Sequence, residues 1–487
     1  MVFSSITFLF LFLPSVILIY LIVPQKFKNF FLMKVSLLFY FWGENYLVWI
    51  ILTTILINYI SGLYIESALK KNNEEYNTGK NRKAMIGLIL SVAANLMLLG
   101  YFKYANFFVD NLNFLLNALS SGKETGFELV KIILPLGISF YTFQAMSYTI
   151  DVYRGEVKAT HNIINFACYV TLFPQLVAGP IVRYRDIDDQ LCNHRMSAPY
   201  FAEGVFRFSV GLAKKVLIAN TVAQVADAAF STPLNELGTA FAWVGCLCYT
   251  LQIYFDFSGY SDMAIGLGYI LGFRFLENFN FPYIADSIQD FWRRWHISLS
   301  TWFKDYLYIP LGGNKKGRIR TYFNLFIVFG LCGFWHGASW NFLVWGMYYG
   351  FFLVAERMGL SIILKRFPVI LRHIYVILIV MAGWVLFRAD NLAHALAYLK
   401  IMAGFTSPAA DNTYQFALYC DTFLIVTIIF GVIASMPLTK WLIETCYFFK
   451  ELFIFRLGGY IYIITIFFLS ISVLSSGSYN PFIYFKF

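Results

Sequence analysis

Charge is the scarcest property of this sequence. Only 13% of its 487 residues are Asp, Glu, Lys or Arg, whereas 59% are hydrophobic. Soluble globular proteins carry roughly 25% charged residues, so this chain lacks the charge to cover a water-exposed surface. Many apolar runs approach or exceed the roughly 18 to 20 residues that span a bilayer. The composition therefore predicts an all-α, polytopic integral membrane protein.

The expected spans are distributed over the whole chain. The clearest are residues 3–23, 47–64, 85–101, 237–255, 340–354, 374–387, 416–433 and 459–474, with shorter runs at 30–41 and 163–177. The first run lacks a basic start and a cleavage motif, so we expect it to be a retained span. We expect a single membrane domain, 1–487. It would comprise N-terminal spans (1–130), a catalytic core with short or re-entrant helices (131–355) and C-terminal spans (356–487). Polar residues inside apolar runs are usually functional, and they gather in the core.

Cysteine and histidine are also sparse, with seven and six residues respectively. The odd, dispersed cysteines argue against a disulfide framework. H-E-x-x-H, Cys/His clusters, G-x-S-x-G and the P-loop pattern are all missing, which argues against a zinc enzyme, a serine hydrolase and a P-loop ATPase. What remains is chemistry in which one base activates a hydroxyl against an already reactive acyl donor. Such chemistry needs no metal.

The net charge of +10 is less informative than its placement. Residues 24–34, 70–83 and 304–320 are basic, whereas the turn FWGENY between the first two has no Lys or Arg. Basic loops favour the cytoplasm, so the N-terminus is expected outside. The basic residues are spread over loops beside the bilayer, so we expect no nucleic-acid binding.

One charged stretch, FWRRWHISLSTWFKDYLYIPLGG, occupies residues 291–313. Ser287 and Asp290 have the spacing of a helix start. A continuous helix from there places one set of aromatic and apolar side chains on a single face, with His296 among them. That face comprises Trp292, Trp295, His296, Leu299, Trp302, Phe303 and Tyr306. Structural packing is the alternative explanation for His296.

A second histidine stands in GFWHGASW, residues 333–340, with apolar sequence on both sides. On a helix, Gly330, Gly333 and Gly337 share a face that allows another helix to approach closely. Burial disfavours a protonated imidazole, and the neutral ring can accept a proton as a general base does. The alternative is a core histidine whose hydrogen bonds are satisfied.

Five stretches together resemble the bacterial membrane-bound O-acyltransferases. They are LPLGISFYTFQAMSYTIDVYRG, FPQLVAGPIVRY, YFDFSGYSDMAIGLGYILGF, FWRRWHISLSTWFKDYLYIPLGGN and GFWHGASWNFLVWG. The subgroup is similar to the membrane subunits of alginate and peptidoglycan O-acetyltransferases, with teichoic acid D-alanyl transferases as close relatives. YIPLGGN favours the acetylating branch.

The resemblance implies a ring of transmembrane helices around short, tilted central helices. His336 matches the family's essential histidine, and His296 matches the histidine of its other signature stretch. The implied donor is acetyl-CoA from the cytoplasm, without a metal. The implied acceptor is a hydroxyl on the outer side of the bacterial cytoplasmic membrane, used for polysaccharide O-acetylation with an SGNH-type acyltransferase of the periplasm or cell surface.

Further residues are candidates for holding the donor. Lys304, Lys315, Lys316 and Arg318 would bind CoA phosphates, although topology alone also explains them. Arg154, Arg183 and Arg185 are weaker candidates. Trp295, Trp335, Asp256 and Ser258 are expected to line the tunnel, or alternatively to pack helices.

Other functions stay open at this stage. A polysaccharide transporter or flippase is also polytopic with polar residues at mid-depth, but it predicts two similar halves, which the sequence does not show. Within acyl transfer, D-alanylation and the acylation of a lipid or protein compete with polysaccharide O-acetylation.

Overall fold

A computed structural model describes residues 2–70, 81–120, 126–127, 131–194, 196–405, 413–438, 453–477 and 479–483. Within these ranges all regular secondary structure is helical, which confirms the all-α prediction. The basic loop expected at 70–83 lies mostly outside the described residues.

Residues 13–271 of the described chain contain twelve α-helices. They are α1 (Leu13–Ile22), α2 (Lys28–Glu44), α3 (Val48–Lys70), α4 (Arg82–Leu99), α5 (Ala105–Leu119), α6 (Ile138–Arg154), α7 (Ile163–Thr171), α8 (Phe173–Leu176), α9 (Tyr184–Cys192), α10 (Ala198–Ala213), α11 (Asn220–Ser231) and α12 (Thr239–Leu271). The second half contributes α13 (Ile288–Arg294), α14 (Ile297–Phe303), α15 (Arg318–His336), α16 (Trp340–Ala355), α17 (Ser361–Leu364), α18 (Val369–Arg388), α19 (Leu392–Met402), α20 (Thr413–Tyr419), α21 (Thr422–Ala434) and α23 (Phe453–Ser475).

Six segments of the described chain are long and apolar enough to cross a bilayer. They are Gln25–Lys70, Arg82–Leu119, Thr239–Leu271, Trp340–Leu364, Val369–Arg388 and Leu457–Ser475. The prediction of a multi-pass membrane protein is therefore confirmed.

Two of the expected spans are broken. Residues 416–433 form α20 and α21, because the Asp421 side chain accepts a hydrogen bond from Leu424 N and starts a new helix. Residues 163–177 form α7 and α8, separated by extended backbone at Leu172.

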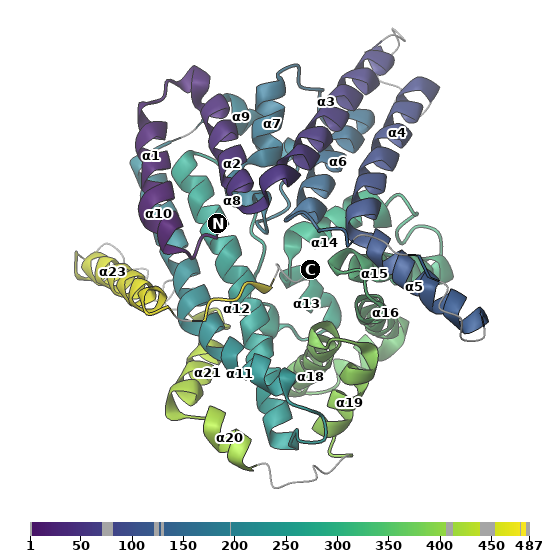
Figure 1. Ribbon diagram of the computed structural model, residues 1–487, viewed down its shortest axis with the longest axis vertical. Helices are drawn as coiled ribbons and strands as arrows, with labels where there is room; N and C mark the ends of the chain where they lie inside the picture. Colours follow the sequence, from purple (N-terminus) through teal and green to yellow (C-terminus); the bar gives the residue numbers. More distant parts are fainter. Residues whose placement is uncertain are drawn as a thin grey trace.

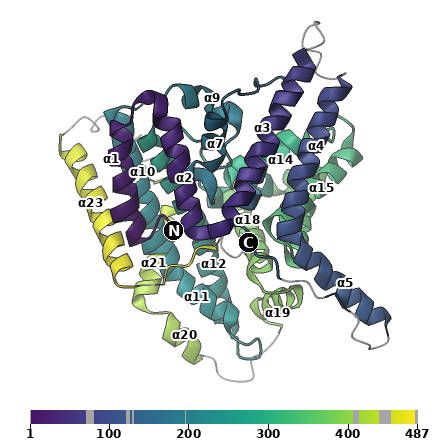
Figure 2. The same ribbon diagram turned by 45° about the horizontal axis from the view of Figure 1, so that its top comes forward.

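The outer helices surround the short helices α13 and α14 (Figure 1). On one side α3 and α4 lie side by side, and on another α23 lies along the outside of the molecule (Figure 2). Both chain ends approach the middle of the molecule, where Asn480 Nδ2 donates to Ser4 O at 3.1 Å. This arrangement confirms the expected ring around short central helices.

The long helix α12 forms the buried spine of the molecule. Two of its carboxylates are compensated by adjacent lysines of the π-helical turn Lys214–Ala219. Lys215 pairs with Asp256 at 2.8 Å, and Lys214 pairs with Asp262 at 2.7 Å. Buried charges persist in such an interior only when they are paired, so these polar residues hold helices together.

Helices α15 and α16 cross closely at two glycines. A Cβ on Gly333 would lie 2.1 Å from Phe342 O, and one on Gly346 would lie 2.1 Å from Phe329 O. The expected close approach at Gly333 is therefore present. Gly337 differs from the expectation because α15 ends at His336 and Gly337 is extended. Ser339 then caps α16 by accepting from Asn341 N.

Candidate active site

The stretch around His296 is two helices rather than one. Ser287 caps α13 by accepting from Asp290 N, as its spacing predicts. The expected continuous helix is wrong, because His296 has a left-handed backbone (φ 44°) between α13 and α14. For a non-glycine residue this conformation is uncommon and strained, and such strain gathers at functional sites.

Asn278 holds the break in place and orients His296. Its Oδ1 accepts from the backbone N of Ser298 at 3.2 Å, which identifies that atom as the oxygen. His296 Nδ1 lies 3.1 Å from the same oxygen and must therefore donate. In the neutral ring Nε2 is then an acceptor. That atom is buried and has no hydrogen-bond partner within the described part of the chain.

His336 lies at the carboxyl end of α15, beneath a layer of aromatic rings. Its ring centroid is 4.9 Å from Trp335, 5.1 Å from Trp345 and 5.4 Å from Phe387. Its Nδ1 is buried and meets no hydrogen-bond partner among the residues described. The side chain is not a satisfied core histidine, and no hydrogen bond there fixes its tautomer.

Both imidazoles lie beside the Trp335 ring, 6.3 Å from His296 and 4.9 Å from His336 between centroids. His336 and Trp335 also line a small cavity of about 20 Å³, bounded by the 134–140 segment, Val177 and Lys103. That volume admits about one water-sized group.

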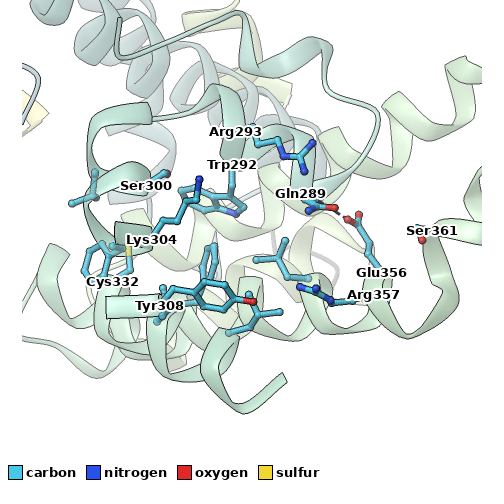
Figure 3. A pocket seen from close by; sticks show the side chains of 16 residues that line it. Gln289, Trp292, Arg293, Ser300, Lys304, Tyr308, Cys332, Glu356, Arg357 and Ser361 are labelled. Atoms are coloured by element: carbon cyan, nitrogen blue, oxygen red, sulfur yellow. Dashed lines mark hydrogen bonds between the residues drawn. The ribbon is translucent and has the colours of Figure 1, made fainter. Parts of the chain in front are cut away.

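A larger cavity of about 500 Å³ is lined by residues of α13, α14, α15 and the segment that follows α16 (Figure 3). Arg293, Lys304 and Arg357 line it, and none has a carboxylate within ion-pair distance in the described chain. Its one lining carboxylate, Glu356, accepts from Ile288 N at 2.7 Å and so caps α13. The cavity therefore carries a net positive lining that suits an anion.

The two cavities share no lining residue. Trp292 lines the larger one, and its ring contacts Trp345 at 5.6 Å, which in turn contacts His336 at 5.1 Å. Two indoles thus lie between the basic cavity and the catalytic candidate.

The other residues that the sequence predicted to be functional differ in whether they line one of these two cavities. Lys304 lines the larger cavity, whereas Lys315, Lys316 and Arg318 are exposed outside it. Trp335 lines the small cavity. Trp295, Asp256 and Ser258 are buried but line neither cavity.

The three weaker arginine candidates have partners within the protein. Arg183 and Arg185 both bind Asp305 Oδ2, at 2.9 and 3.1 Å. Arg154 Nη2 donates to Asp305 O at 3.0 Å. Their charges are thus used to join α6, α9 and the end of α14.

Four residues that the structure makes functional candidates were not identified from the sequence. Arg293 stood within the RRWH stretch, Arg357 at a span end, and Lys103 alone in the apolar run NLMLLGYFKYANFF. A lone intramembrane cation is itself a functional signal. Asn278 had no such signal, because only the fold brings it to His296.

Comparison with known proteins identifies the family of this chain. Residues 154–399 match the membrane-bound O-acyltransferase family. The chain is 48% identical to the Pseudomonas putida protein named "Probable alginate O-acetylase AlgI", over 83% of this chain and 81% of that protein. It is 38% identical to the peptidoglycan O-acetyltransferase of Helicobacter pylori, over 83% and 80% respectively. It is 31% identical to the teichoic acid D-alanyltransferase of Bacillus subtilis, over 44% and 56%. The chain belongs to the membrane-bound O-acyltransferase family and is an acyltransferase.

Proposed function

We propose that this protein moves an acetyl group from cytoplasmic acetyl-CoA to a hydroxyl on the far side of the membrane, for O-acetylation of a cell-envelope or exported polysaccharide. The observation that carries the proposal is the pair of buried imidazoles that both lie beside Trp335, each with a nitrogen that has no hydrogen-bond partner in the described chain. Relatives named for alginate and peptidoglycan O-acetylation support the acceptor class.

His336 acts as the general base in this proposal. It takes the proton of the acceptor hydroxyl as that oxygen attacks the thioester carbonyl carbon. The new C–O bond forms, the C–S bond breaks, and the imidazolium returns the proton to the departing thiolate. Its place at the small cavity supports this role, because an acceptor oxygen fits there.

His296 is buried and lines neither cavity, and the role that its hydrogen bonding supports is to position the donor. Because Nδ1 donates to Asn278, Nε2 of the neutral ring can only accept. It therefore suits an amide N–H of the donor better than a developing oxyanion, which needs a donor. The hydrogen bonding therefore supports donor positioning, and not oxyanion stabilisation, as the role of His296.

The larger cavity holds the CoA end of the donor. Its volume of about 500 Å³ is in the range of small-molecule sites. Arg293, Lys304 and Arg357 supply charge for the CoA phosphates, since guanidinium and ammonium groups bind phosphate well. To reach His336, the acetyl end has to pass Trp292 and Trp345, which lie between this cavity and the imidazole.

A partner delivers the acceptor. A cavity with room for one water-sized group does not admit a sugar ring, which supports an acceptor hydroxyl on a slender chain, such as one presented by an SGNH-type acyltransferase at the outer surface. In this proposal the protein lies in the bacterial cytoplasmic membrane, and the basic loops support an orientation with its N-terminus outside. Protease access to an N-terminal tag on intact cells tests that orientation.

The test is acetyl-CoA turnover, by hydrolysis or by transfer to an added hydroxyl acceptor, with the purified protein in lipid nanodiscs, and polysaccharide O-acetylation in cells is the second readout. His336→Ala should lower turnover by at least roughly a hundredfold, because a positioned general base contributes about 10² to 10⁴ in rate. The matched control is His161→Ala, whose side chain is 73% exposed. Near-normal acetylation by a folded His336→Ala protein would contradict the proposal.

A further inference from the structure

The apolar interior contains a lysine with no acidic partner. Lys103 belongs to the π-helical turn Gly100–Tyr104 between α4 and α5, and its side chain is 9% exposed. No carboxylate of the described chain lies within ion-pair distance of it. Burying a charge without a counter-charge costs free energy. The hydrogen bonds of Lys103 must therefore offset that cost.

Those contacts lie at the end of α15. Lys103 Nζ donates to Trp335 O, to Ser139 Oγ at 3.2 Å and, more weakly, to His336 O at 3.4 Å. Its neighbour Tyr104 donates to Phe334 O at 2.9 Å. Lys103 and Tyr104 thus donate hydrogen bonds to three successive carbonyl oxygens in the last turn of α15, those of Phe334, Trp335 and His336.

This attachment stabilises a helix end that needs it. The final carbonyls of a helix have no partner within the helix and carry its negative dipole end, so a cation there is favourable. His336 is the last residue of α15, and its Nδ1 is not hydrogen-bonded in the described structure. Its imidazole is therefore oriented by the backbone of this turn and by the surrounding rings.

We propose that Lys103 is a positioning residue for acyl transfer, which fixes the carboxyl end of α15 so that the His336 imidazole faces the small cavity. The inference rests on the proposed function of His336. Lys103 acts mainly through the backbone, since its hydrogen bonds to α15 all end on carbonyl oxygens, and its Nζ also lies 5.7 Å from the centroid of the Trp335 ring.

The experiment compares Lys103→Met with Tyr104→Phe in nanodiscs. Lys103→Met keeps the length of the side chain but loses the charge and the donors. It should lower kcat by about 10²-fold, because a misplacement of about 1 Å has that effect, while KM for acetyl-CoA changes less than about twofold, since Lys103 is absent from the larger cavity. Tyr104→Phe removes one neutral hydrogen bond and should lower kcat only a few-fold.

Two further measurements separate positioning from general folding. Hydrogen exchange of peptides covering 330–338 should be faster in Lys103→Met than in the wild type, with other helices unchanged. Propylammonium, which replaces the atoms removed in Lys103→Ala, should restore part of the lost kcat of that variant.

A Lys103→Met protein with wild-type kcat and wild-type exchange at 330–338 would overturn the inference. A wild-type protein that turns over no acetyl-CoA contradicts the proposed function instead. In that case the exchange measurement still decides whether Lys103 holds the helix end.

Discussion

His296 and His336 look alike in the sequence, each preceded by tryptophan, yet their surroundings differ. His296 has a left-handed backbone and a hydrogen bond to Asn278 that selects one tautomer. His336 ends a helix and has no hydrogen bond at Nδ1 in the described structure. A ring with a fixed tautomer suits binding, whereas a ring free to exchange a proton suits base catalysis.

At the residue scale, Asn278 is the first point to test. Asn278→Leu removes the oxygen that orders His296 and should lower kcat/KM for acetyl-CoA by roughly tenfold, as loss of an orienting partner typically does. Asn278→Asp keeps an acceptor at that position and should lose less. Equal kcat/KM for the Leu variant and the wild type would show that the tautomer of His296 is irrelevant.

At the element scale, the α15–α16 hairpin carries His336 and depends on backbone contact. The crossing at Gly333 and Gly346 places the ring of Trp345 against the His336 imidazole. Any side chain at these glycines must push the helices apart, so the same contact sets both stability and the position of the base.

Gly346→Ala should therefore lower both thermal stability and kcat. Its Cβ would lie 2.1 Å from a backbone oxygen, and overpacking of this kind costs about 1–3 kcal/mol. Gly330→Ala is the matched control, because its Cβ meets only side-chain atoms, of Met347 at 3.2 Å and of Leu343 at 3.9 Å. Thermal unfolding in detergent and turnover check both variants. A Gly346→Ala protein as stable as Gly330→Ala would contradict the tight crossing.

At the scale of the whole molecule, basic residues have two separate tasks. Arg183 and Arg185 join helices through the Asp305 carboxylate, and Arg154 does so through the backbone oxygen of Asp305. Arg293 and Lys304 belong to the 291–313 stretch and Arg357 follows α16, and all three line one cavity (Figure 3). Only the second group is placed to bind a ligand.

Neutralising that second group should weaken donor binding without affecting chemistry. Arg293→Gln, Lys304→Gln and Arg357→Gln should each raise KM for acetyl-CoA by roughly two- to fivefold, as exposed charge pairs do, with kcat nearly unchanged. The effect should shrink at high ionic strength because salt screens exposed charges. The control combines Lys315→Gln, Lys316→Gln and Arg318→Gln, all outside the cavity. A larger KM effect from this control than from the cavity variants would relocate the phosphate site.

The sequence alone determined the membrane character, the helical class, the family and the two histidines, because hydropathy and local motifs are properties of contiguous residues. It misjudged the backbone at His296 and at Gly337, where a local helical pattern is overridden by contacts with Asn278 and by the start of α16. Only the tertiary structure decided that Lys103 meets α15 and that Arg293 and Arg357 share a cavity. Those contacts join residues far apart in the chain, and no local pattern encodes which distant carbonyl or cavity a buried cation will reach.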